Sequence, residues 1–530
     1  MSDIIPQISH NERLHTRFMK SYKQASATAD NWAPLMEKCF QYAVPFRNNF
    51  YRPLPQQGEQ KGSRIYDTTA VEAVKTFVSR LHNTMTPPQI QWGYLEVSDD
   101  YDKEPPEVKE KAQTELDKYM KKLFEYIHTS NFDVVINECY FDLAIGTACL
   151  VVNPYRKDNP LMFTSIPLDK LKIKESINGR VENWFRCWEQ IKISEINLMW
   201  PQASLTENLK SQLATDPDAS CKKLFEGVIF MPDAEIPYEY CLSDGSEFLF
   251  SQPLETNPGI VWRFQKTNAE TWGRGPVMDA LPSIVSLNEM ARVELASANL
   301  NTFRPYMAFS DNVFNPHTFK LDPFAIIPIA PIGAGSQPPL IPLPDSSSPQ
   351  FAQMTIMDLR NQIKTLLFND ASDSQSIQPQ SATETMINQQ DLAQKIGPLF
   401  TRLQQEFLWP LIKRCMHVLH TTNTLARPDL QGKPIKFKYR SPLAASRGQQ
   451  EMAKFTQFAQ LAQGLYGEQM ANVFINPTKA LYLVADYMQL DPEFLNKPDD
   501  VAAAVSQMAQ AAAEQAEIQQ EQEQQQQPQG

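Results

Sequence analysis

The 530-residue sequence has few of the short signals that mark catalysis, metal binding or membrane insertion. Its seven cysteines are scattered and include no Cys-x-x-Cys pair, which favours free thiols in a reducing cytoplasm. It contains no Gly-x-x-x-x-Gly-Lys loop, so it is not a nucleotide-driven motor of that type. Residues 1–13 lack the apolar core of a signal peptide, and no apolar run approaches the ~18 residues that span a bilayer. We therefore expect no stable membrane insertion.

Positive net charge is also lacking. The formal charge of −12 argues against a general nucleic-acid binder held by phosphate neutralisation, although DNA could still pass close by without being gripped. Glycine is scarce at 18 residues, whereas proline is frequent at 40. Hydrophobic residues make up 42% of the chain and charged residues 21%, which is typical of a folded protein rather than a disordered one. At this length we expect two to four compact regions.

The most informative pattern is a pair of amphipathic helices that flank a proline-rich segment. The first helix follows Gly275 and must end at Arg304-Pro305, because proline disfavours α geometry in the residue before it. Ten prolines from Pro305 to Pro349 exclude a long helix there, and the second helix starts near Phe351. Apolar residues recur three or four positions apart in both helices, as expected for a packed face. They include Ile284, Leu287, Ala291 and Leu295 in the first helix, and Leu359 and Ile363 in the second.

The rest of the chain predicts a mixed fold. The first third reads as helices over 11–29, 32–42, 69–85, 105–127 and 132–145, with a short strand at 92–97. Residues 149–265 predict a β-rich subdomain, because Asn178-Gly179 between two strand-like runs is a strong hairpin signal. Ser381-Ala382-Thr383-Glu384 has capping-box spacing and should open a long helix. Later expectations are a strand at 436–439, helices at 444–465 and 478–488, and a glutamine-rich tail at 501–530.

Three local clusters have both a functional and a structural interpretation. Cys415, His417 and His420 could hold a metal ion, but helix surface or core is the favoured interpretation because no second cluster completes a site. Trp272-Gly273-Arg274-Gly275-Pro276 could be a ligand loop, although a tight turn into the helix explains it more simply. Glu289, Arg292 and Glu294 could form a buried charge network, but a solvated i,i+3 pair is favoured.

With these elements placed, the chain resembles the portal, or head-to-tail connector, proteins of short-tailed (podovirus) bacteriophages. The resemblance covers about residues 11–495 and rests on three stretches in the same order. They are Arg64-Ile65-Tyr66-Asp67-Thr68-Thr69-Ala70 with Met85-Thr86-Pro87-Pro88 and Trp92; Gly273-Arg274-Gly275-Pro276 with Leu281-Pro282-Ser283-Ile284; and Ser381-Ala382-Thr383-Glu384 with Gly397-Pro398 and the run from Arg402 to Ile412.

The resemblance implies an α+β, mainly helical portal fold with a β-rich insert in the wing, two stem helices, a proline-rich clip and a helical C-terminal crown. The implied regions are a wing at 1–278 with its β-rich subdomain at about 149–265, stem helix 1 at 279–303, the clip at 304–350, stem helix 2 at 351–368, a channel loop at 369–380, a long wing helix at 381–420, the crown at 421–500 and a partly disordered tail at 501–530.

The resemblance further implies a structural protein and not an enzyme, with no cofactor, catalytic residue or metal site. It would assemble in the host cytoplasm as a twelve-fold ring at one capsid vertex of the virion, and double-stranded DNA would pass through its channel. Its partners would be terminase, major capsid and scaffolding proteins, the tail adaptor and, as a further candidate, internal core proteins. The candidate DNA-facing residues are Arg360, Lys364, Asp370, Asp373, Gln375 and Gln378.

Two other classes of protein stay open at this point. One is another oligomeric virion component, such as a tail adaptor or an internal core protein. Adaptors are usually shorter than this chain, and a helical core protein should lack the β-rich insert at 149–265. The other is a hydrolase or nuclease whose carboxylates are distant in sequence, for which no residue constellation can be nominated.

Overall fold

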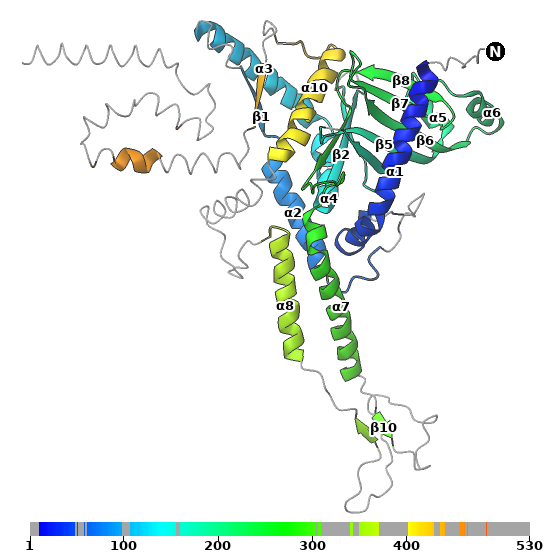
Figure 1. Cartoon of the computed structure of the whole chain (residues 1–530). Helices are drawn as coiled ribbons and strands as arrows, with labels where there is room; N and C mark the ends of the chain where they lie inside the picture. Colours follow the sequence, from blue (N-terminus) through cyan, green and yellow to red (C-terminus); the bar gives the residue numbers. More distant parts are fainter. Residues whose placement is uncertain are drawn as a thin grey trace, which may run out of the picture.

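A computed structural model of the chain shows a broad body from which two long helices project side by side (Figure 1). We use the name body for the described parts of residues 10–275 and 401–439. The structure describes residues 10–47, 50, 58, 61–97, 106–154, 159–176, 178–302, 306–308, 340–342, 349–369, 401–428, 435–439, 455–461, 464 and 484.

Four helices make up the N-terminal part of the body. They are α1 (His10–Ala43), α2 (Thr69–Met85), α3 (Pro106–Thr129) and α4 (Phe132–Ile145), and a single 3-10 turn η1 (Pro45–Arg47) follows α1. The prediction of two helices within α1 was wrong, because the helix continues through Pro34. Proline removes one backbone hydrogen bond there. Ala29, Ala33 and Met36 are buried in the main core on either side, and this packing maintains the helix.

A five-stranded antiparallel sheet forms the β-rich subdomain, as predicted from Asn178-Gly179 and its flanking strands. Its order is β4 (Leu171–Glu175), β5 (Val181–Lys192), β6 (Ser220–Phe230), β7 (Tyr238–Ser243) and β8 (Phe248–Leu254). Two short helices, α5 (Ile193–Met199) and α6 (Glu207–Thr215), interrupt the strands and were missed in the sequence. The N-terminal end of α1 packs on this sheet, where Phe18 lies edge-on to Phe185 with ring centroids 5.4 Å apart.

A second, three-stranded sheet lies at the centre of the body. Its order is β3 (Leu161–Ser165), β2 (Thr147–Pro154) and β9 (Gly259–Arg263), all antiparallel. Its strands and α4 contribute to the main hydrophobic core, in which Trp262 is fully buried. A third pair joins β1 (Gly93–Val97) to β12 (Ile435–Tyr439). The strand predicted at 436–439 is thus confirmed, and it ties this late segment to the N-terminal helices.

The two long helices are α7 (Pro276–Thr302) and α8 (Pro349–Leu366), which pack against each other and extend away from the body (Figure 1). They confirm the predicted pair of helices around a proline-rich segment. Beyond them, β10 (Tyr306–Ala308) pairs antiparallel with β11 (Leu340–Pro342), so the two ends of that segment lie together. Residues 309–339 and 343–348 lie outside the described part of the chain.

The chain re-enters the body through a helix that changes its pitch. Residues 401–403 are α-helical, η3 (Gln404–Leu408) is a π-helical segment, and α10 (Trp409–Thr421) continues the same helix. The predicted helix start at Thr383, the Gly397-Pro398 pair and the glutamine-rich tail lie outside the described residues. In the C-terminal region only short parts are described, of which 455–461 is helical.

Candidate functional site

The α7–α8 pair is held together by an apolar seam close to the body. Ile284, Leu287 and Ala291 on α7 are 3%, 2% and 7% exposed. On α8, Ile363 is fully buried and Leu359 is half-buried against the same core. Ser283 also donates a hydrogen bond to Gln362 across the pair, at 3.2 Å. These residues, singled out by their spacing, therefore pack within one chain.

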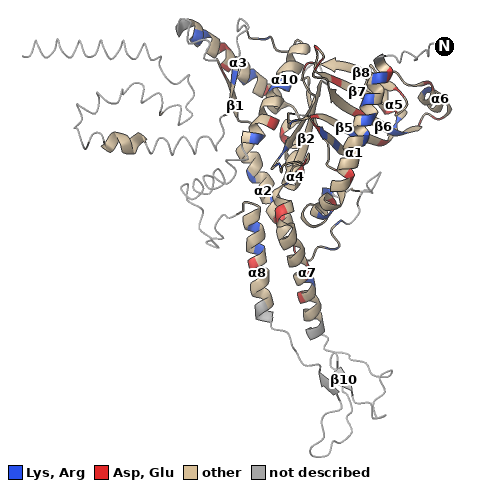
Figure 2. Ribbon diagram, in the orientation of Figure 1, with Lys and Arg blue, Asp and Glu red and all other residues tan. Residues whose placement is uncertain are grey.

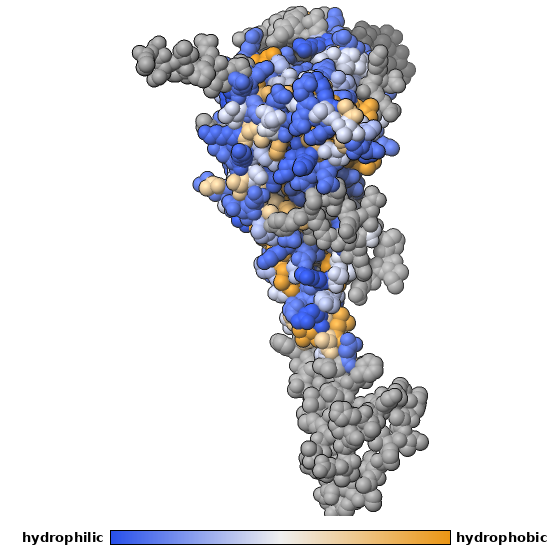
Figure 3. Space-filling view, turned by 90° about the vertical axis from the view of Figure 1, so that its right-hand side faces the viewer, coloured by the Kyte–Doolittle hydropathy of each residue, from blue (hydrophilic) through white to orange (hydrophobic). Residues whose placement is uncertain are grey.

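Farther from the body the pair carries an exposed apolar surface. Leu295, which the spacing grouped with the seam, is 53% exposed, and Val293, on nearly the opposite side of α7, is 55% exposed. Met354 and Met357 on α8 are 68% and 60% exposed. Apolar patches are visible along the α7–α8 pair in the space-filling view (Figure 3). Exposed apolar groups gathered on one projecting element indicate a surface that another molecule covers.

Asp67 and Arg360 fix the upper end of α8 to the start of α2. Arg360 Nη2 lies 2.8 Å from Asp67 Oδ2, and the Thr69 backbone N–H donates to Asp67 Oδ1 at 2.9 Å. Burial raises the pKa of the Asp67 carboxyl, but the hydrogen bonds from Thr69 and the guanidinium of Arg360 outweigh it and lower the pKa below its usual value. Arg360, a candidate DNA contact in the sequence analysis, thus has a carboxylate partner inside the chain.

Side-chain amides and a second arginine complete this anchorage. Asn288 on α7 accepts from the Tyr66 N–H at 2.7 Å and donates to the Arg64 carbonyl at 3.0 Å. After α8, the Phe368 carbonyl accepts from Arg80 at 2.7 Å, and Asn369 donates to the Ala73 carbonyl at 2.7 Å. The stretch 64–70 therefore acts as a strap that binds both long helices to α2.

Glycines explain the turn from the body into α7. A Cβ on Gly273 would overlap the Gly146 carbonyl oxygen, and one on Gly275 would overlap the Ala144 carbonyl oxygen. The Gly273 N–H donates to Thr147 Oγ1 at 2.9 Å. The backbones of the two segments thus touch directly, which only glycine permits. The tight-turn interpretation of 272–276 is confirmed.

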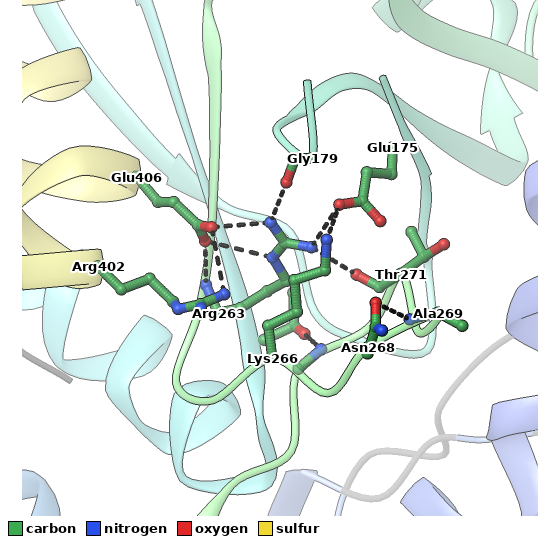
Figure 4. A network of polar contacts seen from close by, with 11 residues as sticks. Glu175, Gly179, Arg263, Lys266, Asn268, Ala269, Thr271, Arg402 and Glu406 are labelled. Atoms are coloured by element: carbon green, nitrogen blue, oxygen red, sulfur yellow. Dashed lines mark hydrogen bonds and ion pairs between the residues drawn. The ribbon is translucent and has the colours of Figure 1, made fainter. Parts of the chain in front are cut away.

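A buried ionic cluster joins the turn region to the helix that re-enters the body (Figure 4). Arg263 on β9 is fully buried, and its Nη2 lies 2.7 Å from Glu406 Oε1 and 2.7 Å from the Gly179 carbonyl oxygen. Glu175 lies 3.5 Å from Arg263 Nη1 and also pairs with Lys266. Glu406 belongs to the π-helical segment η3, a type of distortion that is frequent at functional sites.

Charge on the α7–α8 pair is sparse and nearly balanced (Figure 2). Arg292 pairs with Glu289 on the exposed face of α7, with Nε 3.0 Å from Oε2, so the solvated i,i+3 interpretation is confirmed. The charged residues of the two helices are Asp279, Glu289, Arg292, Glu294, Asp358, Arg360 and Lys364.

The other predicted site residues have varied outcomes. Lys364 lies in the last turn of α8, whereas Asp370, Asp373, Gln375 and Gln378 fall outside the described residues. In the former metal candidate, Cys415 is fully buried, His420 bonds to the Tyr119 hydroxyl at 2.7 Å and His417 pairs with Glu255 at 3.5 Å. These partners confirm the structural interpretation of that cluster.

The described residues contain no group of three or more His, Cys, Asp or Glu that could hold a metal ion. None of their helices is long and apolar enough to cross a membrane. All seven cysteines are free thiols, as expected. The Arg263 cluster and the strap at 64–70 were missed because their partners are far apart in sequence.

Comparisons with known proteins place the chain. The model of the family described as bacteriophage head to tail connecting protein matches residues 15–495. A probable portal protein of Bordetella phage BPP-1 is 20% identical over 536 residues, covering 94% of this chain and 92% of the relative. A solved chain from the virion of a native gene transfer agent particle covers 82% of this chain and 98% of its own length, at 11% identity and a TM-score of 0.36. Because the family model spans nearly the whole sequence, the chain belongs to the bacteriophage head to tail connecting protein family.

Proposed function

We propose that the protein is the portal subunit of a phage virion and forms a twelve-fold ring at one capsid vertex. The ring would be a conduit for double-stranded DNA during packaging and ejection. It would dock terminase and later the tail proteins, and nucleate procapsid assembly. Membership of the head to tail connecting family supports this role, and so does the likeness to a probable portal protein.

The observation that carries the proposal is the exposed apolar surface on the projecting α7–α8 pair. Val293 and Leu295 on α7 and Met354 and Met357 on α8 are each more than half exposed. One chain alone leaves these groups in water, which is unfavourable. A ring repeats one head-to-tail contact and covers such a surface in every subunit.

In this proposal the regions keep the roles that the resemblance gave them. Residues 1–278 are the wing, α7 and α8 are the stem helices, and 304–350 between them is the clip. Residues 369–380 are the channel loop, 381–420 the long wing helix, 421–500 the crown and 501–530 the tail. The anchoring of α8 to α2 by Asp67 and Arg360 suits a stem that must hold its position while DNA moves past it.

The charges of the two long helices suit passage rather than retention of DNA. Of their three basic residues, Arg292 and Arg360 are paired with carboxylates of the same chain. Free lysines and arginines would bind phosphates and add salt-dependent drag. Arginines that are already paired with carboxylates would bind the phosphates of the duplex weakly, so the DNA could move past them.

The first test is negative-stain electron microscopy of the purified protein, with native mass measurement. We expect rings with a central hole and a mass near twelve copies of 60.4 kDa, about 725 kDa. A monomer or dimer under salt conditions that favour assembly would contradict the proposal. Assays for nuclease and hydrolase activity would then follow.

A further inference from the structure

A cavity of about 320 Å³ lies between α10 and the edge of the five-stranded sheet, away from the α7–α8 pair. Its walls are the end of β2, the segment after α5, strands β7 and β8, and α10. Rim residues such as Gln202, Gln252 and Thr422 are exposed, so a ligand can enter from solvent. The volume falls in the range of small-ligand pockets.

Arg414 of α10 lines this cavity and is only 4% exposed. Its Nε donates to the Val152 carbonyl at 3.2 Å, and its Nη1 donates to the carbonyl and hydroxyl of Thr256 at 3.3 and 3.0 Å. Within the described part of the chain, no carboxylate lies at ion-pair distance from Arg414, and Nη2 has no hydrogen-bond acceptor. The guanidinium is thus buried among neutral partners, and the N–H donors of its Nη2 have no acceptor among them.

The other buried arginine of the described residues has a different environment, because Arg263 lies against Glu406 and Glu175. Even the part-buried Arg47 lies 2.8 Å from a carboxylate, that of Asp142. An unpaired buried charge is costly, and this is why such charges normally acquire a counter-ion. Burial lowers the pKa of Arg414 to about 10, so the side chain is still charged at neutral pH. The described residues therefore supply no negatively charged partner for Arg414.

The remaining surface of the cavity indicates what should accompany that negative charge. Trp200, Phe250 and Leu254 provide apolar walls. The Tyr240 hydroxyl is already satisfied, because it accepts from Trp200 at 2.8 Å and donates to Glu226 at 2.9 Å. Burial and the nearby Arg414 lower the pKa of His417 more than the exposed Glu255 carboxylate, 3.5 Å away, raises it, and the net lowering favours the neutral imidazole at pH 7. The site thus offers a single positive charge beside an apolar wall, which fits a monoanion better than a phosphate dianion.

From this arrangement we propose that the cavity binds an acidic peptide segment of a partner protein, with a carboxylate on Arg414 and a neighbouring apolar side chain against Trp200 and Phe250. A carboxylate oxygen can accept a charge-assisted hydrogen bond from the N–H groups of Arg414 Nη2, which have no acceptor among the described residues. The proposal is independent of ring formation and of the DNA conduit, because the cavity is complete within one chain.

The test uses two capped dipeptides that differ only in charge, acetyl-Phe-Glu-amide and acetyl-Phe-Gln-amide. Saturation-transfer NMR on the purified full chain measures their binding, with inorganic phosphate as a competitor. We expect the Glu peptide to bind at least about tenfold more tightly than the Gln peptide, as a charge-assisted hydrogen bond would give. Phosphate should not displace it. Equal binding, no binding of either peptide up to about 10 mM, or displacement by phosphate would overturn the proposal.

Two variants locate the site. Arg414→Gln keeps amide donors for the Thr256 carbonyl but removes the charge, so it should abolish the preference for the Glu peptide. Gln252→Trp at the rim should block both peptides without touching Arg414, and it serves if the first variant does not fold. Arg292→Gln, on the distant face of α7, is the matched control and should bind as the wild type does. Unchanged preference in Arg414→Gln would refute the role of Arg414.

Discussion

At the scale of single residues, direct backbone contact decides how α7 leaves the body. Gly273 and Gly146 press their backbones together, and Arg263 Cβ lies 2.8 Å from the position that a Cβ on Gly273 would take. There is no flexible side chain that could move aside. Adding one methyl group here must displace the main chain of either segment.

We predict that Gly273→Ala lowers the free energy of unfolding by about 3 kcal/mol, or prevents folding, because of this overlap. Thermal unfolding followed by circular dichroism measures the change. Gly464→Ala is the control, since a Cβ there meets nothing within 4 Å and the residue is helical. Equal stability of both variants would mean that the two segments are not in contact.

The ionic cluster around Arg263 gives a second prediction at this scale. Arg263→Met leaves Glu406 and Glu175 without their shared cation, and we expect a loss of about 3–5 kcal/mol. Denaturant unfolding measures it. The exposed pair of Arg292 and Glu289 provides the control, because Arg292→Met should have no measurable effect. A small effect of Arg263→Met would show that Lys266, which pairs with Glu175, and Arg402, 3.8 Å from Glu406, neutralise the two glutamates without Arg263.

At the scale of elements, the position of α8 depends on a few polar links to α2. Asp67 and Thr69 lie at the start of α2, and Arg360 reaches Asp67 from the last two turns of α8. The strap at 64–70 and Asn288 hold α7 to the same place. Either long helix should therefore loosen when these links are weakened, while the body stays folded.

The lowered pKa of Asp67 makes this link sensitive to pH in a defined direction. A carboxyl with a lowered pKa stabilises the fold above its unfolded pKa of about 3.9, and this contribution is lost as the pH falls through the folded pKa. We predict that Asp67→Asn costs about 1 kcal/mol at pH 7, given the half-exposed Arg360, and that the difference from wild type shrinks below about pH 4. Thermal unfolding from pH 3 to 7 tests this. A difference independent of pH would mean that the ion pair contributes nothing.

At the scale of the whole molecule, two leucines on one helix should behave differently. Leu287 is 2% exposed in the core of the chain itself, whereas Leu295 is 53% exposed. We predict that Leu287→Asp destabilises the subunit by roughly 3 kcal/mol or more, because it buries a charge. Leu295→Asp should leave the subunit folded within about 0.5 kcal/mol but prevent ring assembly.

Circular dichroism measures unfolding of the subunit, whereas native mass and negative-stain images report ring assembly. Together they distinguish a subunit that does not fold from one that folds but does not assemble. Ser286→Asp is the matched control, because Ser286 is exposed and lies about 13 Å along the helix from Leu295, closer to the body than Val293 or Leu295. It adds the same charge and should still permit rings. Normal rings from Leu295→Asp would contradict the assignment of this surface to subunit contacts.

Local patterns were sufficient to place most elements of the body. Apolar periodicity predicted α2 and α3, and Asn178-Gly179 predicted the β4–β5 hairpin. The α7–α8 pair could be predicted because the ten prolines from Pro305 to Pro349 exclude a long helix between them. The helices α5 and α6 were missed, since they are short and their stability comes mainly from packing against the sheet.

The sequence by itself determined the helix periodicity, the hairpin turn and the family, because each depends on neighbouring residues or on motif order. Only the tertiary structure decided which charges meet. Arg360 reaches Asp67 across 293 positions, Arg263 reaches Glu406 across 143, and Arg414 meets no described carboxylate. Tertiary structure likewise separated Leu287 from Leu295, which share one apolar pattern but not one environment. Periodicity reports the face of a helix, whereas burial depends on what the rest of the chain places against that face.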